Sequence, residues 1–189
     1  MVIKIVDQIN DDELAESAWQ LYYAAFSELN TMAVQRHLMY RHEFDEVMQD
    51  NRVQKYLYLD DAGSLLGIST YTNDLDAVPL IAPEYFARHW PEHYAARKIW
   101  YIGFVAVDSA ARGRHVFGPL VQEMYLVAAT QNGLVGLDVC NYNDDVLNMT
   151  RIFRSMVSRL SDNMRFQRID QQSFWLYEFP TDPAQAAAA

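Results

Sequence analysis

The sequence has little of several features that would mark a specialised class of protein. Cysteine occurs once in 189 residues, at Cys140, so the chain can form no internal disulfide, and this usage fits a reducing compartment. No apolar run approaches the ~20 residues that cross a bilayer. The first residues, Met-Val-Ile-Lys-Ile-Val, lack the basic start, apolar stretch and cleavage site of a secretory signal. These absences predict a cytoplasmic protein without a membrane partner.

Positive charge is also scarce. Lys and Arg number 15 against 25 Asp and Glu, which gives a formal net charge of −10. This balance disfavours nucleic acid and anionic membranes as partners and favours a cationic small molecule such as an amine. Apolar residues make up 51% of the chain and charged residues 21%, as in soluble globular proteins. The length is that of one domain with one core.

The hydrophobic pattern alternates between short apolar runs, typical of strands, and stretches with a 3.6-residue period, typical of helices. Asn10-Asp11-Asp12 offers an N-cap, and Asp60-Asp-Ala-Gly63 offers a hairpin turn. Strands are expected at 2–6, 53–59, 65–72, 98–107, 134–140, 165–169 and 173–179, and helices at 12–27, 32–48, 83–90, 116–131 and 141–160. This order predicts an α/β fold, in which helices cover both faces of one mixed sheet.

The stretch from Trp100 to Leu120 is the most informative part of the chain. Residues 100–107 form an apolar run that is typical of a buried strand, and an Arg-Gly-Arg turn at 112–114 leads into the next helix. The first turn of a helix has unpaired N–H groups and the positive end of the helix dipole. Two arginines beside it would add charge-assisted bonds to phosphate, so we expect an anion site here.

This stretch resembles the acyl-CoA-binding core of the GCN5-related N-acetyltransferase (GNAT) superfamily. There a strand ends in Val-x-Pro-x-x-Arg-Gly-x-Gly-(Ile/Val)-(Gly/Ala)-x-x-Leu, and amides after the Arg hold the CoA pyrophosphate. Five residues of this chain stand at matching places: Val107, Arg112, Gly113, Val116 and Leu120. Three depart from the pattern, because Ser109 replaces the Pro, and His115 and Phe117 stand where small residues are usual.

The resemblance covers nearly the whole chain in the order of its elements. It implies one domain over 1–179 with splayed central strands at 98–107 and 134–140 and an insertion over 73–97. The tail at 180–189 is short and weakly patterned, so we expect it to be mobile. The resemblance also implies acetyl-CoA or another acyl-CoA as co-substrate and no metal. The residues expected to contact it are Phe104, Val105, Ala106, Val107, Arg112, Gly113, Arg114, His115, Val116, Phe117, Gly118, Asn141 and Asn143.

The catalytic acid and base are harder to place. The strand at 100–107 contains no acidic residue, although family members often carry a Glu there. Tyr101 lies near that position and is the candidate to position a water, and Tyr142 is the nearest substitute for the usual tyrosine acid. Cys140 is a nucleophile in principle, but a small apolar residue ending a buried strand is the commoner reason for a cysteine there.

The activity that the resemblance implies is direct transfer of an acyl group, acetyl by preference, from acyl-CoA to a primary amine of a small molecule. Two alternatives stay open. One is a long-chain N-acyl amino acid synthase-like enzyme fed by acyl-carrier protein, and the other is a non-catalytic ligand-binding or interaction protein. A homodimer is an assembly that the sequence allows. No metal site is expected, because Pro91 disrupts the helical face that would join His89 to His93.

Overall fold

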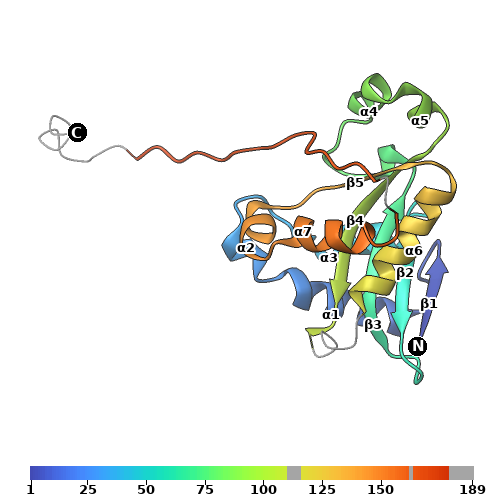
Figure 1. The fold of residues 1–189 in the computed structure, drawn as a ribbon. Helices are drawn as coiled ribbons and strands as arrows, with labels where there is room; N and C mark the ends of the chain where they lie inside the picture. Colours follow the sequence, from blue (N-terminus) through green and yellow to red (C-terminus); the bar gives the residue numbers. More distant parts are fainter. Residues whose placement is uncertain (110–115, 162–163, 179–189) are drawn as a thin grey trace, which may run out of the picture.

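The computed structural model describes residues 1–109, 116–161 and 164–178, and these form a mixed sheet with helices on both faces (Figure 1). The strands are β1 Val2–Val6, β2 Gln54–Leu59, β3 Leu65–Thr72, β4 Ile99–Val107 and β5 Leu134–Leu137. The helices are α1 Asp12–Phe26, α2 Leu29–Met32, α3 Arg41–Gln49, α4 Pro83–His89, α5 Pro91–Ala95, α6 Phe117–Thr130 and α7 Met149–Val157, with a 3₁₀ turn at Leu75–Ala77 and a π-helical turn at Tyr142–Val146.

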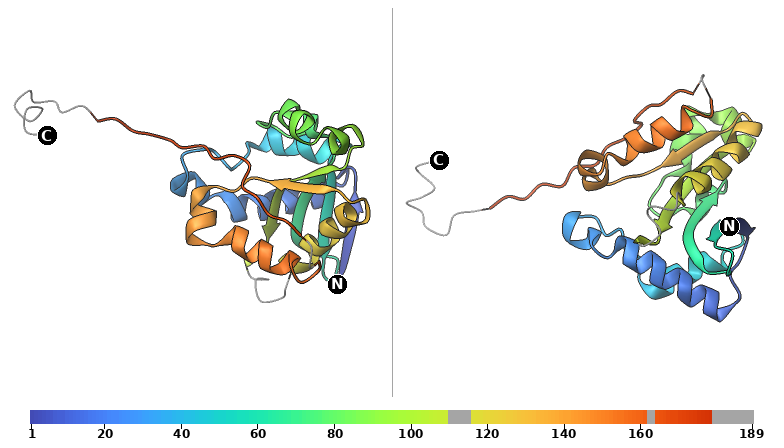
Figure 2. Two further views of the ribbon diagram at one scale, coloured as in Figure 1. Left: turned by 45° about the horizontal axis from the view of Figure 1, so that its top comes forward. Right: turned by 60° about the horizontal axis from the view of Figure 1, so that its bottom comes forward.

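The sheet has the order β1-β2-β3-β4-β5. Strands β1 to β4 pair with one another in antiparallel fashion, and β5 pairs with β4 in parallel. Helices α1 and α3 cover one face, and α6 and α7 cover the other (Figure 2). The predicted α/β fold, a mixed sheet between two helical layers, is therefore confirmed.

Local signals in the N-terminal half act as the sequence indicates. The Asp11 side chain accepts a hydrogen bond from the Leu14 amide at 2.8 Å and so caps α1. Asp60 begins the turn between β2 and β3, where its carbonyl accepts from the Gly63 amide at 3.0 Å. Both elements follow from residues within a few positions of each other, which is why the sequence alone predicts them.

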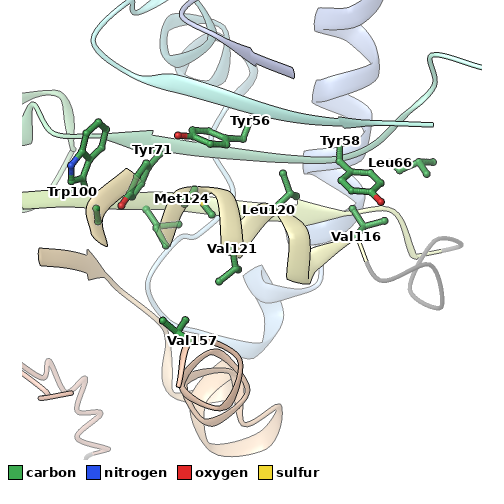
Figure 3. Packing of buried hydrophobic residues seen from close by; sticks show 12 residues of the cluster. Tyr56, Tyr58, Leu66, Tyr71, Trp100, Val116, Leu120, Val121, Met124 and Val157 are labelled. Carbon is green, nitrogen blue, oxygen red and sulfur yellow. The ribbon is translucent and has the colours of Figure 1, made fainter. Parts of the chain in front are cut away.

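Three apolar clusters form the core. The α1-side cluster joins Tyr22 and Phe44 to Leu57, Ile68 and Phe104 of the sheet. The α6-side cluster lies on the opposite face, where Val116 and Leu120 meet the sheet and Val157 reaches in from α7 (Figure 3). A smaller α4-side cluster covers the start of β4. Its buried members are Leu75, Phe86, Ile99 and Tyr101.

Strand β4 contains a bulge at Gly103. Its register with β3 shifts there, because Tyr71 pairs with Ile102 whereas Thr70 pairs with Phe104. A Cβ on Gly103 would lie 2.6 Å from the Thr70 hydroxyl oxygen, so only glycine fits this position. The bulge reverses the alternation of side chains: Ile102 joins the α6-side cluster, and two residues later Phe104 joins the α1-side cluster.

The prediction of one helix over 32–48 is wrong. Helix α2 ends at Met32, and α3 begins only at Arg41. Between them the Tyr22 hydroxyl donates to the His37 carbonyl at 3.0 Å and accepts from the Met39 amide at 2.9 Å. These bonds to a distant helix hold the segment in a non-helical path.

The prediction of one continuous helix over 141–160 is also wrong. The π-helical turn at Tyr142–Val146 ends in a break, because Asn148 has a φ of 54° in the left-handed region. Asparagine tolerates that conformation better than most residues. Helix α7 then starts at Met149.

The strand expected over 134–140 is shorter and more exposed than predicted, since β5 ends at Leu137 and its residues alternate between half-buried and exposed. The two strands expected at 165–169 and 173–179 are absent from the described residues 164–178. That segment instead crosses the β5 side of the molecule and then extends away from it (Figure 1).

The region 73–97 contains the helix expected near Pro83, which is α4, and a second short helix, α5. Both belong to the layer that packs over the start of β4. Its description as an insertion remains a prediction, and the tail at 180–189 lies outside the described residues. Among the residues that are described, no helix is both long and apolar enough to cross a membrane.

Candidate active site

Strands β4 and β5 separate like the arms of a fork. They pair in parallel only from Ile99–Leu134 to Ile102–Leu137. Beyond that point β4 continues to Val107 along β3, while the chain after Leu137 turns away toward the π-helical turn. Within the described residues, the edge of β4 from Gly103 to Val107 that faces away from β3 pairs with no strand. The predicted splay of the central strands is present.

Hydrogen bonds to β3 show which amides line this open edge. The Asp108 amide donates to the Leu66 carbonyl at 2.9 Å, and the Phe104 amide donates to the Thr70 hydroxyl at 3.2 Å. Because alternate residues of an antiparallel strand point their N–H groups to the same side, the amides of Val105 and Val107 lie on the open edge. Val105 therefore supplies the amide closest to the fork.

The side chains of the predicted contact residues on β4 face the core. Phe104 and Ala106 are buried in the α1-side cluster. Val105 and Val107 are partly buried against the α6-side cluster. Any contact of these four residues with a ligand in the fork would therefore be made chiefly by the backbone.

The N-terminus of α6 follows the end of β4. Val116 is the N-cap residue and is buried at 1% exposure. No side chain of the described residues caps this end, so the amides of Phe117 and Gly118 keep no helical partner. The Phe117 ring is partly buried against the α6-side cluster. The predicted contacts at Arg112, Gly113, Arg114 and His115 lie outside the described residues.

Tyr101 and Asp138 meet at the base of the fork. The Tyr101 hydroxyl donates to Asp138 Oδ1 at 3.0 Å, although the two residues are 37 positions apart. Tyr101 is buried at 5% exposure, whereas Asp138 is exposed. Burial raises the pKa of Tyr101, and the Asp138 carboxylate raises it further. The phenol thus keeps its proton at neutral pH and orients the carboxylate.

Gly136 makes this contact possible. It pairs with Tyr101 across the two strands, and a Cβ on Gly136 would lie 2.9 Å from the Tyr101 ring. The ring can cross β5 only because that Cβ is missing. Asp138 is not among the residues that the sequence predicts for the site, because the resemblance implies an acid on the strand that is β4. The signal in the sequence was an Asp two residues after a glycine in the neighbouring strand.

The other predicted residues lie farther along the second arm. Asn141 is exposed, and Tyr142 and Asn143 are partly exposed at the start of the π-helical turn. No hydrogen bond joins Tyr142 to Tyr101, so the structure does not bring the two predicted catalytic tyrosines into direct contact through their hydroxyls. Cys140 is a free, half-buried thiol on the same arm.

Two shallow hollows occur elsewhere on the described surface. One of about 430 Å³ lies between β1 and α6, beside Ile3 and Glu123. The other, of about 250 Å³, lies at the start of β4 beside Asp74 and Arg97. Neither adjoins the fork. The described residues also hold no group of three or more His, Cys, Asp or Glu side chains placed to bind a metal ion.

Solved structures share this arrangement of elements. The tetramutant of the BH1408 protein from Bacillus halodurans aligns with a TM-score of 0.56 at 16% identity, over 93% of this chain and 100% of that one. An aminoglycoside acetyltransferase from an uncultured soil metagenomic sample, in complex with sisomicin, aligns with a TM-score of 0.54 at 14% identity, over 93% and 96%. An N-acetyltransferase from Staphylococcus aureus Mu50 aligns with a TM-score of 0.50 at 19% identity, over 82% and 83%.

No protein-family model and no curated protein matches the sequence. The structural likeness, at identities below 20%, defines the fold: the chain has the fold of the GNAT acetyltransferases. Because one fold hosts many functions, the activity depends on the residues at the fork.

Proposed function

We propose that this protein is an N-acyltransferase that moves an acyl group from acyl-CoA to a primary amine of a small molecule. The observation that carries the proposal is the fork between β4 and β5, which combines an open strand edge with a carboxylate. The Val105 amide lies on one arm, and Asp138 lies at the start of the other. Acyl transfer requires a hydrogen-bond donor for the oxyanion and a proton acceptor for the amine.

Each group has a defined role in this proposal. The Val105 amide stabilises the negative charge that develops on the thioester oxygen. Asp138 accepts the proton that the attacking amine loses, and Tyr101 holds the carboxylate in place through its 3.0 Å hydrogen bond. The new N–C bond forms as the C–S bond breaks, and the thiolate takes a proton from water. Tyr101 is thus a positioning residue rather than the acid or base expected from the sequence.

The open edge also fits the extended arm of a CoA thioester. Backbone groups of Val105 and Val107 can pair with the amides of the pantetheine arm as a strand would. The N-terminus of α6, which no side chain of the described residues caps, supports a pyrophosphate site there, since the first-turn amides and the dipole of a helix attract anions. The contribution of Arg112 and Arg114 to this site rests on the sequence alone.

A small cationic amine is the favoured acceptor. The chain carries a net charge of −10, which raises the local concentration of cations. The structurally similar protein solved with sisomicin is an aminoglycoside acetyltransferase. This similarity supports an amine as the acceptor.

Isothermal titration calorimetry with acetyl-CoA and longer acyl-CoA species tests the donor. We expect micromolar binding, and we expect Arg112→Ala to weaken it by about 1–3 kcal/mol, the usual loss for a charge-assisted bond. Arg88→Ala on the exposed face of α4 is the matched control and should bind as the wild type does. Failure of every acyl-CoA to bind would refute the proposed donor.

The non-catalytic alternative predicts binding without turnover, so it is separated by product analysis. A carrier-protein-fed synthase predicts instead that acyl-carrier protein, and not acyl-CoA, supports transfer of a long chain. Mass spectrometry of the amine after incubation with each donor distinguishes an acyl-CoA-dependent enzyme, a carrier-protein-fed synthase and a non-catalytic protein.

A further inference from the structure

Four consecutive residues in the segment from Ser173 to Glu178 have exposed apolar side chains. Phe174, Trp175, Leu176 and Tyr177 are 51%, 80%, 93% and 77% exposed. Aromatic residues in such a run have high strand propensity. Alternate side chains of a strand point to opposite faces, and here both faces are apolar. That pattern is typical of a strand covered on both sides, yet the described residues leave more than half of each of these four side chains exposed.

The outer edge of β5 is an unpaired sheet edge to which such a strand can add. It is one of two sheet edges, and no described residue pairs with its outer side. Edges are commonly protected by charged residues. Strand β1 at the opposite edge contains Lys4, whereas β5, Leu-Val-Gly-Leu, contains no charge. Val135 and Leu137 beside this edge are each 36% exposed.

Two contacts fix the direction in which the segment leaves the body. The Tyr85 hydroxyl of α4 donates to the Ile169 carbonyl at 3.3 Å. Arg168 forms an ion pair with Asp144 of the π-helical turn at 3.1 Å. These contacts hold residues 168–169 on the β5 side, and the chain beyond them extends away from the sheet (Figures 1 and 2). Reaching its own β5 would require the segment to reverse direction.

We propose that residues 173–178 of one copy add as a strand to the outer edge of β5 of a second copy, in a reciprocal exchange about a twofold axis. In each copy, residues 173–178 leave the body on the same side as the receiving edge of β5. A twofold dimer can therefore bring the segment of each copy to the β5 edge of the other. The occupant is therefore a second copy of this chain. The inference does not depend on the proposed acyltransferase activity.

The area involved suits a stable dimer. Three aromatic side chains bury roughly 150–250 Å² each, so with Leu176 one segment would cover on the order of 700 Å². Reciprocal exchange doubles this to about 1,400 Å², and the receiving surfaces add to it, so the total exceeds the ~1,200 Å² at the lower end of specific protein interfaces. Backbone hydrogen bonds along β5 would add specificity, as in other cases of strand addition.

Sedimentation equilibrium of the full chain tests the proposal, combined with hydrogen exchange of the amides in 173–178. We expect a dimer with slowed exchange in the segment. Leu176→Asp should weaken the dimer by roughly 10- to 100-fold, because a buried leucine is replaced by a charge. Leu80→Asp is the matched control, since Leu80 is 90% exposed in a loop, and it should leave the dimer unchanged.

A second variant tests the receiving edge. Val135→Lys places a charge beside β5 and should weaken the dimer without changing the fold, which far-ultraviolet circular dichroism can check. Three results would overturn the proposal: a monomer whose segment exchanges freely, a monomer whose segment is protected, which indicates docking on its own chain, or a dimer that Leu176→Asp does not weaken. Mixing unlabelled and isotopically labelled copies, followed by native mass spectrometry, should give heterodimers.

Discussion

The two halves of the sheet differ in how completely they are closed. In the inner half, β1 to β3 pair along nearly their whole length, and Leu57 and Ile68 are fully buried beneath α1 and α3. In the open half, β4 parts from a four-residue β5, and Leu137 is 36% exposed. The inner half therefore supplies most of the stability, while the open half keeps backbone groups and a carboxylate free for a ligand.

This contrast also separates the roles of two charged side chains, one buried and one exposed. Lys55, in the inner half, is fully buried, and its ammonium donates to the carbonyls of Asp7, Asp50 and Val53 at 2.7–2.8 Å. It is saturated with partners and serves the fold. Asp138 accepts from Tyr101 but is otherwise exposed, so it has acceptor capacity left for a substrate.

The same substitution in each half tests most directly whether the inner half contributes more to stability than the open half. Leu57→Ala removes a fully buried side chain and should lower the free energy of unfolding by about 2–5 kcal/mol. Leu137→Ala, at 36% exposure, should lower it by less than about 1 kcal/mol. Urea unfolding measures both, and equal losses would show that the two halves are equally important for stability.

Replacing the Asp138 carboxylate at the fork should have the next largest effect, which is on kcat. Asp138→Asn keeps the shape of the side chain but cannot accept a proton, so kcat should fall by about 100-fold with little change in stability. Asp145→Asn, at an exposed position on the π-helical turn, is the matched control. Steady-state kinetics with an acyl-CoA and an accepted amine supply the measurement; an unchanged kcat would remove Asp138 from the site.

Loss of the phenol should have a smaller effect. Tyr101→Phe deletes only the hydroxyl that orients Asp138, so kcat should fall by about tenfold while KM stays the same. Because burial raises the pKa of Tyr101, its phenol does not titrate between pH 6 and 9. Wild type and variant should therefore share one pH–rate shape over that range. A limb that disappears in Tyr101→Phe would assign proton transfer to the tyrosine itself.

The smallest expected effect is a pH dependence of stability in the inner half. Burial lowers the pKa of Lys55 to about 8, below the ordinary lysine pKa of 10.5 that holds in the unfolded chain. Between these values the unfolded chain binds more protons, so this residue makes the fold more stable as the pH rises. The gain is at most about 1.4 kcal/mol per pH unit.

Lys55→Met isolates that contribution, because all other titrating groups remain. The difference in unfolding free energy between wild type and Lys55→Met should increase from pH 7.5 to 9.5 in urea titrations. A constant difference would mean that Lys55 titrates alike in the folded and unfolded chains.

The sequence predicts the elements whose causes are local. Asp11 caps α1, and the turn at Asp60 joins β2 to β3, through bonds between residues four or fewer positions apart. It does not predict the break before α3, because a distant hydroxyl on Tyr22 holds the intervening segment. The left-handed Asn148 is likewise invisible to a hydrophobic pattern that continues on both sides of it.

The residues of the candidate site also differ in whether local sequence or a distant contact places them. The helix start follows from an apolar strand joined to a helix, and the fork was expected from the resemblance in element order. The contacts predicted at Val105, Val107 and Phe117 remain predictions. Asp138 could not be placed, because its partner Tyr101 lies 37 residues away and the contact depends on the missing Cβ of Gly136. The two C-terminal strands were predicted from their apolar pattern, but a strand also needs a partner edge, and within the described residues no strand pairs with them.

The central claim is that the open half of the sheet catalyses acyl transfer to an amine. Release of free thiol from acyl-CoA in the presence of a panel of primary amines, with the acylated amine identified by mass spectrometry, tests it most directly. We predict thiol release that depends on at least one amine and yields an N-acylated product. An acyl-CoA that binds at the fork but releases no thiol above the buffer rate with any amine would contradict the claim.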